Sequence, residues 1–194
     1  MSLYTNIGKD IETLHLLLPG ASQGPNVGIL KFVSDRLKST GKTYLAVSFP
    51  FQDKGHDSPE SQAFNAEIAE VMRGLKHIES EVSPKRMVII GKSFGALVGA
   101  KMLPILKENY SAEIEFHVLG YIFDEGLSPI AQAEKVFVYQ GEFDRFGTPE
   151  QVREKLPNAK VFSIQGADHS YRNDKKEPVF EVEVLNLLSV NLSL

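Results

Sequence analysis

The sequence predicts an α/β fold in which a mostly parallel central sheet is covered by helices on both faces. Short apolar runs alternate along the chain with longer segments that have helical periodicity. No repeat, low-complexity segment or linker interrupts this alternation. Strands separated by helices are typical of a parallel sheet that is buried on both sides. We expect one domain over residues 1–194, long enough to bury a sizeable core.

Three strands are predicted in the first half of the chain, at residues 13–18, 43–49 and 86–90. A helix is expected between the first two, over about residues 27–38, because apolar residues recur there at the i, i+3 and i+4 spacing. A second helix is expected to begin at Ser58, a good cap, with Pro59 at the first helical position. This helix should reach about residue 78, just before the third strand.

The second half of the chain continues the same pattern. A helix should follow the third strand and reach about residue 108, with Pro104 kinking or shortening it. Three further strands are expected, one within residues 114–123 and the others at 135–140 and 160–164. A short helix over 149–156 and an amphipathic helix from Pro178 complete the fold. Ligands bind beyond the carboxyl ends of strands in such sheets, so the residues directly after each strand are the candidates for function.

Composition excludes several classes of function. The chain has no cysteine, which excludes disulfides, thiolate catalysis and thiolate metal sites. The net charge is −4 and no basic stripe is present, so we expect no nucleic-acid partner. No apolar run approaches the ~20 residues of a spanning helix, and the first residues do not resemble a secretory signal. We therefore expect a soluble, cytoplasmic protein without membrane insertion, and no metal or cofactor motif is present.

The motif GKSFGA, at residues 91–96, directly follows the third strand and opens a helix. A nucleophile elbow requires a strand, a sharp turn and a helix in this order, with small residues around the serine. The start of the helix also places free N–H groups near the serine oxygen. We interpret Ser93 as a candidate nucleophile. The alternative is a tight turn in which the hydroxyl caps the helix.

A serine nucleophile needs a histidine base, and the chain contains five histidines. His169, in GADHSY, follows the last predicted strand and precedes the last helix, which makes it the candidate base. The alternative for this residue is a structural role in its turn with Asp168. Of the other four histidines, we expect His15, His77 and His117 to have structural roles. The fourth, His56, is expected to lie at the surface.

The histidine in turn needs an orienting carboxylate. Asp144, in GEFDRFG after the fifth strand, is the preferred candidate, and Asp124 at the end of the fourth strand is the alternative. An aspartate at either place could also simply form a turn. With Asp144, the order along the chain is Ser93, Asp144, His169, which is the order of nucleophile, acid and histidine in α/β-hydrolases.

Acyl transfer develops negative charge on the substrate oxygen, which two N–H donors should meet. The backbone N–H of Phe94, the residue after the candidate nucleophile, would be one donor. The other would come from the loop PGASQG after the first strand, where Ala21 is the candidate. A turn built from small residues would explain the same loop without any oxyanion hole.

These segments, taken together, resemble a known family. LLLPGASQG, SFPFQDKG, GKSFGA, LGYIF, QGEFDRFGTPE and GADHSY resemble segments of small α/β-hydrolases in order and spacing, over about residues 14–171. The nearest group is the KANSL3/Tex30-like hydrolases, which are relatives of dienelactone hydrolase. Pro19 replaces the usual histidine of the oxyanion loop, and Ala96 replaces a residue that is often glycine. The resemblance implies the α/β-hydrolase fold and a Ser-His-Asp triad.

The predicted site should be open and shallow, because the residues between Ser93 and Asp144 leave no room for a large cap domain. Several aromatic residues near strand ends are candidates for lining it, with core packing as the alternative for each. The candidates for substrate binding are Phe51, Tyr121, Phe143 and Phe146. Lys92, beside the nucleophile, would favour an anionic substrate if it faced the site, but we expect a solvated lysine.

The sequence thus predicts a serine hydrolase that cleaves small or medium acyl esters and needs no cofactor. A thioesterase, acyltransferase or peptidase would use the same residues, and they remain alternatives. A binding or scaffold protein with the hydrolase fold but little activity is an alternative of another class. The oligomeric state cannot be predicted from the sequence.

Overall fold

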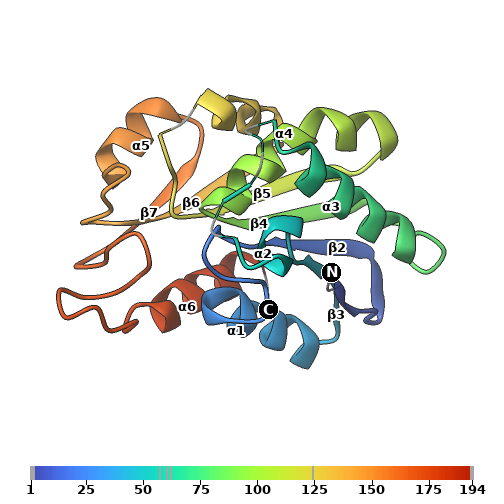
Figure 1. Cartoon of the computed structure of the whole chain (residues 1–194), viewed down its shortest axis with the longest axis horizontal. Helices are drawn as coiled ribbons and strands as arrows, with labels where there is room; N and C mark the ends of the chain where they lie inside the picture. The colour runs from blue at the N-terminus through green and yellow to red at the C-terminus, as the bar shows by residue number, and fades with distance from the viewer. Residues whose placement is uncertain (1–2, 57, 60, 62, 124, 193–194) are drawn as a thin grey trace.

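A seven-stranded sheet forms the centre of the computed structural model, which describes residues 3–56, 58, 59, 61, 63–123 and 125–192 (Figure 1). The strand order is β1-β3-β2-β4-β5-β6-β7, and every neighbouring pair is parallel except β1 with β3. The strands are β1 (Leu3–Asn6), β2 (Asp10–Leu18), β3 (Lys42–Val47), β4 (Arg86–Lys92), β5 (Glu113–Leu119), β6 (Lys135–Gly141) and β7 (Lys160–Ile164). The predicted mostly parallel α/β sheet is confirmed.

Helices cover both faces of the sheet, as expected (Figure 1). One face carries α1 and α6, and the other carries α3, α4, α5 and the 3₁₀ segment η1. The bounds are α1 (Gly28–Ser39), α2 (Pro50–Asp53), α3 (Asn65–Ile78), α4 (Phe94–Asn109), η1 (Glu125–Gln132), α5 (Pro149–Lys155) and α6 (Glu181–Leu192). Within the described residues between Ser93 and Asp144, the elements are α4, β5, η1 and β6, and no cap domain is present.

Two hydrophobic clusters, one on each face of the sheet, make up the core. Leu16 of β2 and Ile89 of β4 face the cluster under α3 and α4, whereas Leu17 and Ile90 face the cluster under α1 and α6. Consecutive residues of a strand point to opposite faces, so strands that are buried on both sides read as continuous apolar runs. This explains why TLHLLL and MVII show no polar alternation.

The helix α3 does not begin at Ser58 and Pro59, so the predicted start of this helix was wrong. The helix begins at Asn65, although it ends at Ile78 as expected. Phe64, directly before it, has a left-handed backbone with a φ of 57°, and its ring packs 4.9 Å from the ring of Phe94. The burial of this ring sets where the helix begins, because a tertiary contact of this size outweighs a local capping signal.

Of the two effects expected at Pro104, shortening of the helix is not found, which is a second correction. α4 continues through Pro104 to Asn109. A proline inside a helix removes one backbone hydrogen bond. Most side chains of α4 are buried against the sheet and neighbouring helices, so tertiary packing offsets that loss. Three short elements, β1, α2 and η1, were not predicted from the sequence.

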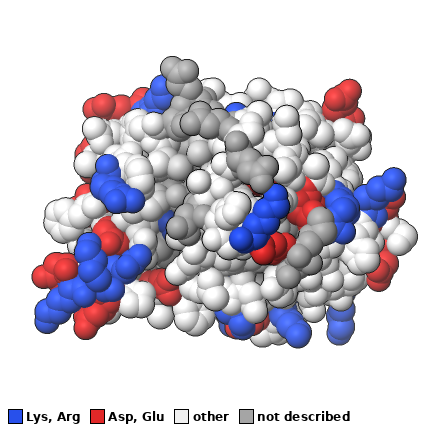
Figure 2. Space-filling model, viewed as in Figure 1, with Lys and Arg blue, Asp and Glu red and all other residues white. Residues whose placement is uncertain are grey.

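Charge of both signs is spread over the visible face of the molecule (Figure 2). Lys and Arg side chains gather with Asp and Glu over the loop between β7 and α6, at the lower left of Figures 1 and 2. None of the helices in the described part of the chain combines the length and apolar character required to cross a membrane.

Candidate active site

Ser93 occupies a strained turn between β4 and α4. Its φ is 50° and its ψ is −112°, a conformation that costs free energy for a residue other than glycine. Its N–H donates to the carbonyl of Leu119 at 3.0 Å, and its carbonyl accepts from Ala96 N–H at 2.9 Å. Gly95 must lack a side chain, because a Cβ there would lie 2.2 Å from the carbonyl oxygen of Leu18. The turn is therefore fixed against both neighbouring strands.

Phe94 anchors this turn through its side chain. Its buried ring makes edge contacts with three other rings, at centroid distances of 5.5 Å to Phe49, 5.4 Å to Phe51 and 4.9 Å to Phe64. As the first residue of α4, Phe94 has a backbone N–H with no acceptor inside the helix. This N–H also lies at the positive end of the α4 dipole.

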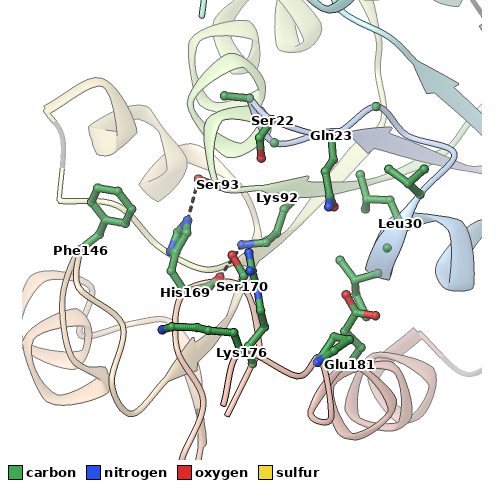
Figure 3. A pocket seen from close by; sticks show the side chains of 18 of the residues that line it. Ser22, Gln23, Leu30, Lys92, Ser93, Phe146, His169, Ser170, Lys176 and Glu181 are labelled. Carbon is green, nitrogen blue, oxygen red and sulfur yellow. Dashed lines mark hydrogen bonds between the residues drawn. The ribbon is translucent and has the colours of Figure 1, made fainter. Parts of the chain in front are cut away.

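The structure brings Ser93, His169 and Asp144 together in a chain of hydrogen bonds, of which Figure 3 shows the one between Ser93 and His169. The Ser93 Oγ lies 2.8 Å from His169 Nε2, and His169 Nδ1 lies 2.7 Å from Asp144 Oδ2. The other oxygen of Asp144 accepts a hydrogen bond from the backbone N–H of Phe146 at 2.8 Å. With Nδ1–H donating to the carboxylate, Nε2 is free to accept the serine proton.

The surroundings of His169 favour the neutral imidazole. Burial lowers the pKa of His169 below its usual 6.5, and the charges of Lys92 and Arg145 lower it further. The hydrogen bond and the charge of Asp144 act in the opposite direction without reversing the shift. An imidazole that is neutral at pH 7 can act as a base, as a serine nucleophile requires.

Lys92 is enclosed beside His169, which corrects the expectation of a solvated lysine. Its Nζ donates to the backbone carbonyl of His169 at 2.7 Å and lies 5.1 Å from the centre of the Tyr171 ring. Burial lowers the pKa of Lys92 to about 8, although the charges of nearby carboxylates oppose the shift. Gly120, with a φ of 75°, makes room for this contact, because a Cβ there would lie 3.0 Å from both Lys92 Nζ and His169 Cε1.

The loop after β2 is held by Gln52, a residue of α2 that the sequence analysis did not single out. Its Nε2 donates to the carbonyls of Gly20 at 2.7 Å, Gln23 at 3.0 Å and Ala21 at 3.3 Å. Its Oε1 accepts from the backbone N–H of Phe49 at 3.0 Å. In a trans peptide the N–H points opposite to the preceding carbonyl, so the N–H of Ala21 is directed away from Gln52.

A cavity of about 660 Å³ opens beside Ser93. Its wall includes the β2 exit loop from Gly20 to Gly24, the first residues of α1, and the segment around His169 (Figure 3). Phe146, Ser93 and His169 lie toward one side, Gln23, Leu30 and Glu181 lie toward the other, and Lys92 lies between them (Figure 3).

Of the four aromatic residues predicted to line the site, only Phe146 borders this cavity. The ring of Phe146 borders this cavity and packs edge-on against His169, with 4.7 Å between ring centres. Phe51 and Tyr121 are buried in the core, and Phe143 is 68% exposed; none of the three belongs to the wall of this cavity. Apolar side chains at strand ends are drawn into the core unless neighbouring elements leave an opening, which the sequence does not reveal.

Two of the remaining histidines have structural partners, as expected. His15 Nδ1 lies 2.9 Å from the carbonyl of Thr43, and His117 bonds to Glu115 and to the hydroxyl of Tyr139. Asp124, the alternative acid, lies outside the described residues. No group of three or more His, Asp or Glu side chains within the described ranges is arranged to hold a metal ion.

Comparison with known proteins identifies the family. The sequence model of the alpha/beta hydrolase domain matches residues 12–192, and the chain therefore belongs to this family. A search of curated protein sequences gives no match.

Three solved structures share the fold. An alpha-beta serine hydrolase homologue from Coxiella burnetii has a TM-score of 0.75 and 19% identity, covering 98% of this chain and 90% of its own. A serine hydrolase without a lid from Xanthomonas campestris has a TM-score of 0.69 and 15% identity, covering 98% and 87%. Est1E from Butyrivibrio proteoclasticus, solved with ferulic acid bound, has a TM-score of 0.64 and 14% identity, covering 100% and 96%.

Proposed function

We propose that this protein is a serine hydrolase that cleaves small or medium acyl esters through a covalent acyl-enzyme. The observation that carries the proposal is the chain of hydrogen bonds from Ser93 Oγ through His169 to Asp144, at 2.8 and 2.7 Å. Both distances lie within the range in which a base can accept the proton of a nucleophile. Membership of the alpha/beta hydrolase domain family supports this assignment.

In the proposed mechanism, Ser93 Oγ attacks the acyl carbonyl while its proton passes to Nε2 of His169. Asp144 holds the imidazole in the required tautomer and stabilises its charge. The imidazolium then protonates the departing alcohol as the tetrahedral intermediate collapses to the acyl-enzyme. Water attacks the acyl-enzyme with His169 again as base, and this step releases the acid and restores Ser93.

The oxyanion of the tetrahedral intermediate needs donors that are in place before the reaction. We assign this role to the backbone N–H groups of Phe94 and Ala21. The fixed turn at Ser93 supports the first assignment, since it holds the start of α4 in place. The hydrogen bonds of Gln52 support the second, because they turn the carbonyl of Gly20 toward Gln52 and leave the N–H of Ala21 on the other side.

The cavity supports a substrate of modest size. Its volume of about 660 Å³ is in the range of small-molecule sites, and it opens directly beside Ser93. Est1E, a structural neighbour, was solved with ferulic acid bound, and a small organic acid of this kind is a ligand of the modest size proposed here. We place the chain in the KANSL3/Tex30-like group on the segments described above, and we propose a cytoplasmic enzyme.

The proposal is tested by measuring the hydrolysis of 4-nitrophenyl esters with acyl chains of increasing length. The wild-type protein should show a maximum of kcat/KM at a small or medium chain. Ser93→Ala and His169→Ala should each lose at least about 10³-fold in kcat, because residues that act as one unit each remove most of the rate. Thioester and amide analogues of the best substrate then separate esterase from thioesterase and peptidase activity.

His77→Ala is the matched control for these variants. His77 lies on α3 and does not belong to the cavity wall, so this change should leave kcat within about twofold. A folded wild-type protein that hydrolyses none of the esters, or a Ser93→Ala protein that is as active as the wild type, would contradict the proposal.

A further inference from the structure

The wall of the cavity beside Ser93 has a charge opposite to that of the whole chain. The chain carries a net charge of −4, yet among the described residues four cationic side chains line this cavity against a single carboxylate, that of Glu181. The cations are Lys92, Arg145, Arg172 and Lys176. A cleft lined by one sign of charge concentrates ligands of the opposite sign.

Two of these cations have no salt-bridge partner among the described residues. Within the part of the chain that the structure describes, neither Arg145 nor Arg172 forms a salt bridge, and Arg145 instead lies 4.7 Å from the centre of the Phe146 ring. The Lys176 side chain is 69% exposed and pairs with Asp168 at 3.3 Å, so a neighbouring carboxylate balances part of its charge. Arg172 and Arg145 are therefore the guanidinium groups that remain available to a ligand.

Lys92 adds a positive charge in the middle of the cavity. It lies between the Ser93 side and the Glu181 side in Figure 3, and its bond to the carbonyl of His169 leaves two of its three N–H donors. The charges of Asp144, Asp168 and Glu181 raise the pKa of Lys92, and the charge of Arg172 lowers it. The charges of Lys92 and Arg172 in turn lower the pKa of Glu181, so these three side chains interact electrostatically. Burial nevertheless raises the pKa of Glu181.

The first turn of α1 also adds positive potential to the cavity. Gly28, Ile29 and Leu30 line the cavity, the residue before them provides no side-chain cap, and the first turn contains no acidic residue. The N–H groups at this end of the helix carry partial positive charge. The carboxylate of Glu181 lies close to Gly28 and opposes this potential.

We infer that the substrate carries an anionic group, a carboxylate or phosphate, in addition to the ester bond, and that Arg172 with Lys92 holds this group. Guanidinium and ammonium groups form strong charge-assisted hydrogen bonds with such anions. The reacting carbonyl would lie at Ser93 and the anion farther along the cavity, toward Arg172. This inference rests on the proposed function, because it names the class of substrate for the same site.

The experiment compares three 4-nitrophenyl esters of nearly equal length that differ only at the far end of the acyl chain. One is the monoester of adipic acid, which ends in a carboxylate; the second ends in the neutral amide; the third ends in a trimethylammonium group. The expected kcat/KM for the carboxylate is at least about tenfold above that for the amide, equivalent to ~1.4 kcal/mol. The trimethylammonium ester should be the poorest substrate.

Two variants locate the anion. Arg172→Gln should reduce the ratio of carboxylate to amide rates severalfold, and Lys175→Gln, an exposed neighbour outside the cavity wall, should leave the ratio unchanged. The ratio should also fall with added salt, because ions screen charges at a partly open site. Adipate and inorganic phosphate are then compared as inhibitors of the hydrolysis of the ester that ends in the neutral amide. The stronger inhibitor shows which anion fits the site better.

The possible results separate the two proposals. A ratio near one, or faster cleavage of the trimethylammonium ester, with turnover that still depends on Ser93, would overturn the anionic substrate and leave the hydrolase intact. An unchanged ratio in Arg172→Gln would also overturn the assignment of the site. Absence of Ser93-dependent turnover of all three esters would contradict the proposed function itself.

Discussion

Two carboxylates lie close to His169, and they have different hydrogen-bond partners. Asp144 accepts from His169 Nδ1, whereas Asp168, the neighbour in sequence, accepts from the backbone N–H groups of Ser170 and Arg172. A carboxylate on the imidazole fixes its tautomer, but a carboxylate that closes a turn does not.

Asp144→Asn should therefore lower kcat at pH 7 by about 10³- to 10⁴-fold, because the wrong imidazole tautomer then faces Ser93. Ester hydrolysis at constant pH measures this effect. Asp168→Asn is the matched control and should cost less than about tenfold, since an amide oxygen can still accept the two N–H groups. Equal losses in the two variants would contradict the assignment of Asp144.

Lys92 should influence the pH dependence of activity. Its positive charge disfavours protonation of His169 and so lowers the pKa of the imidazole. In Lys92→Met that pKa should rise, and the acid limb of the profile of kcat/KM against pH should move to higher pH. The loss of the bond to the carbonyl of His169 should lower kcat as well.

Lys175→Met serves as the control for charge alone, because Lys175 is exposed and lies outside the cavity wall. The acid limb of the profile of kcat/KM against pH for Lys175→Met should coincide with that of the wild type. An unchanged limb in Lys92→Met, or one that moves to lower pH, would show that Lys92 does not act on His169.

At the scale of elements, the short helix α2 links the loop after β2 to the rest of the fold. Gln52 makes three hydrogen bonds to this loop, which contains the proposed oxyanion donor Ala21. Gln52→Ala should lower kcat by about 10- to 100-fold with little change in KM, because a misplaced donor weakens binding of the transition state more than binding of the substrate.

Gln151→Ala is the control for this prediction. Gln151 caps α5 in the way that Gln52 caps α2, by accepting from the N–H of Thr148 at 2.8 Å, but it does not contact the loop. Its loss should affect stability alone. A fall in kcat of the same size in both variants would point to a general loss of structure.

Elements with strong periodicity or a continuous apolar run were predictable, and elements set by tertiary contacts were not. The strands β2 to β7 follow from their apolar runs, and the glycines around Ser93 indicated a sharp turn. β1 is short and pairs at the sheet edge, and the start of α3 depends on burial of the Phe64 ring. Likewise, the roles of Gln52 and Lys92 depend on contacts between loops that are far apart in the sequence. No local pattern in the sequence indicates these contacts.

At the scale of the whole molecule, a buried neutral histidine couples stability to pH. His15 is 2% exposed, and burial lowers its pKa to about 4. Between pH 6.5 and 4 the unfolded chain binds a proton at this residue and the folded protein does not. The free energy of unfolding therefore falls as the pH falls through this window, by on the order of 3 kcal/mol for this group.

His15→Asn should flatten this dependence, because asparagine does not titrate and its amide can still donate to the carbonyl of Thr43. Urea unfolding of wild type and variant at several pH values between 4 and 7 measures the difference. His77→Asn, a change on α3, provides the control. The same slope in wild type and His15→Asn would contradict the account.

The most direct test of the central claim is covalent labelling of Ser93 by a fluorophosphonate, followed by mass spectrometry of the intact protein and of its peptides. We expect one adduct, located on Ser93, that is absent in Ser93→Ala and forms much more slowly in His169→Ala. A folded wild-type protein that does not react, or an adduct on another residue, would contradict the claim that Ser93 is an activated nucleophile.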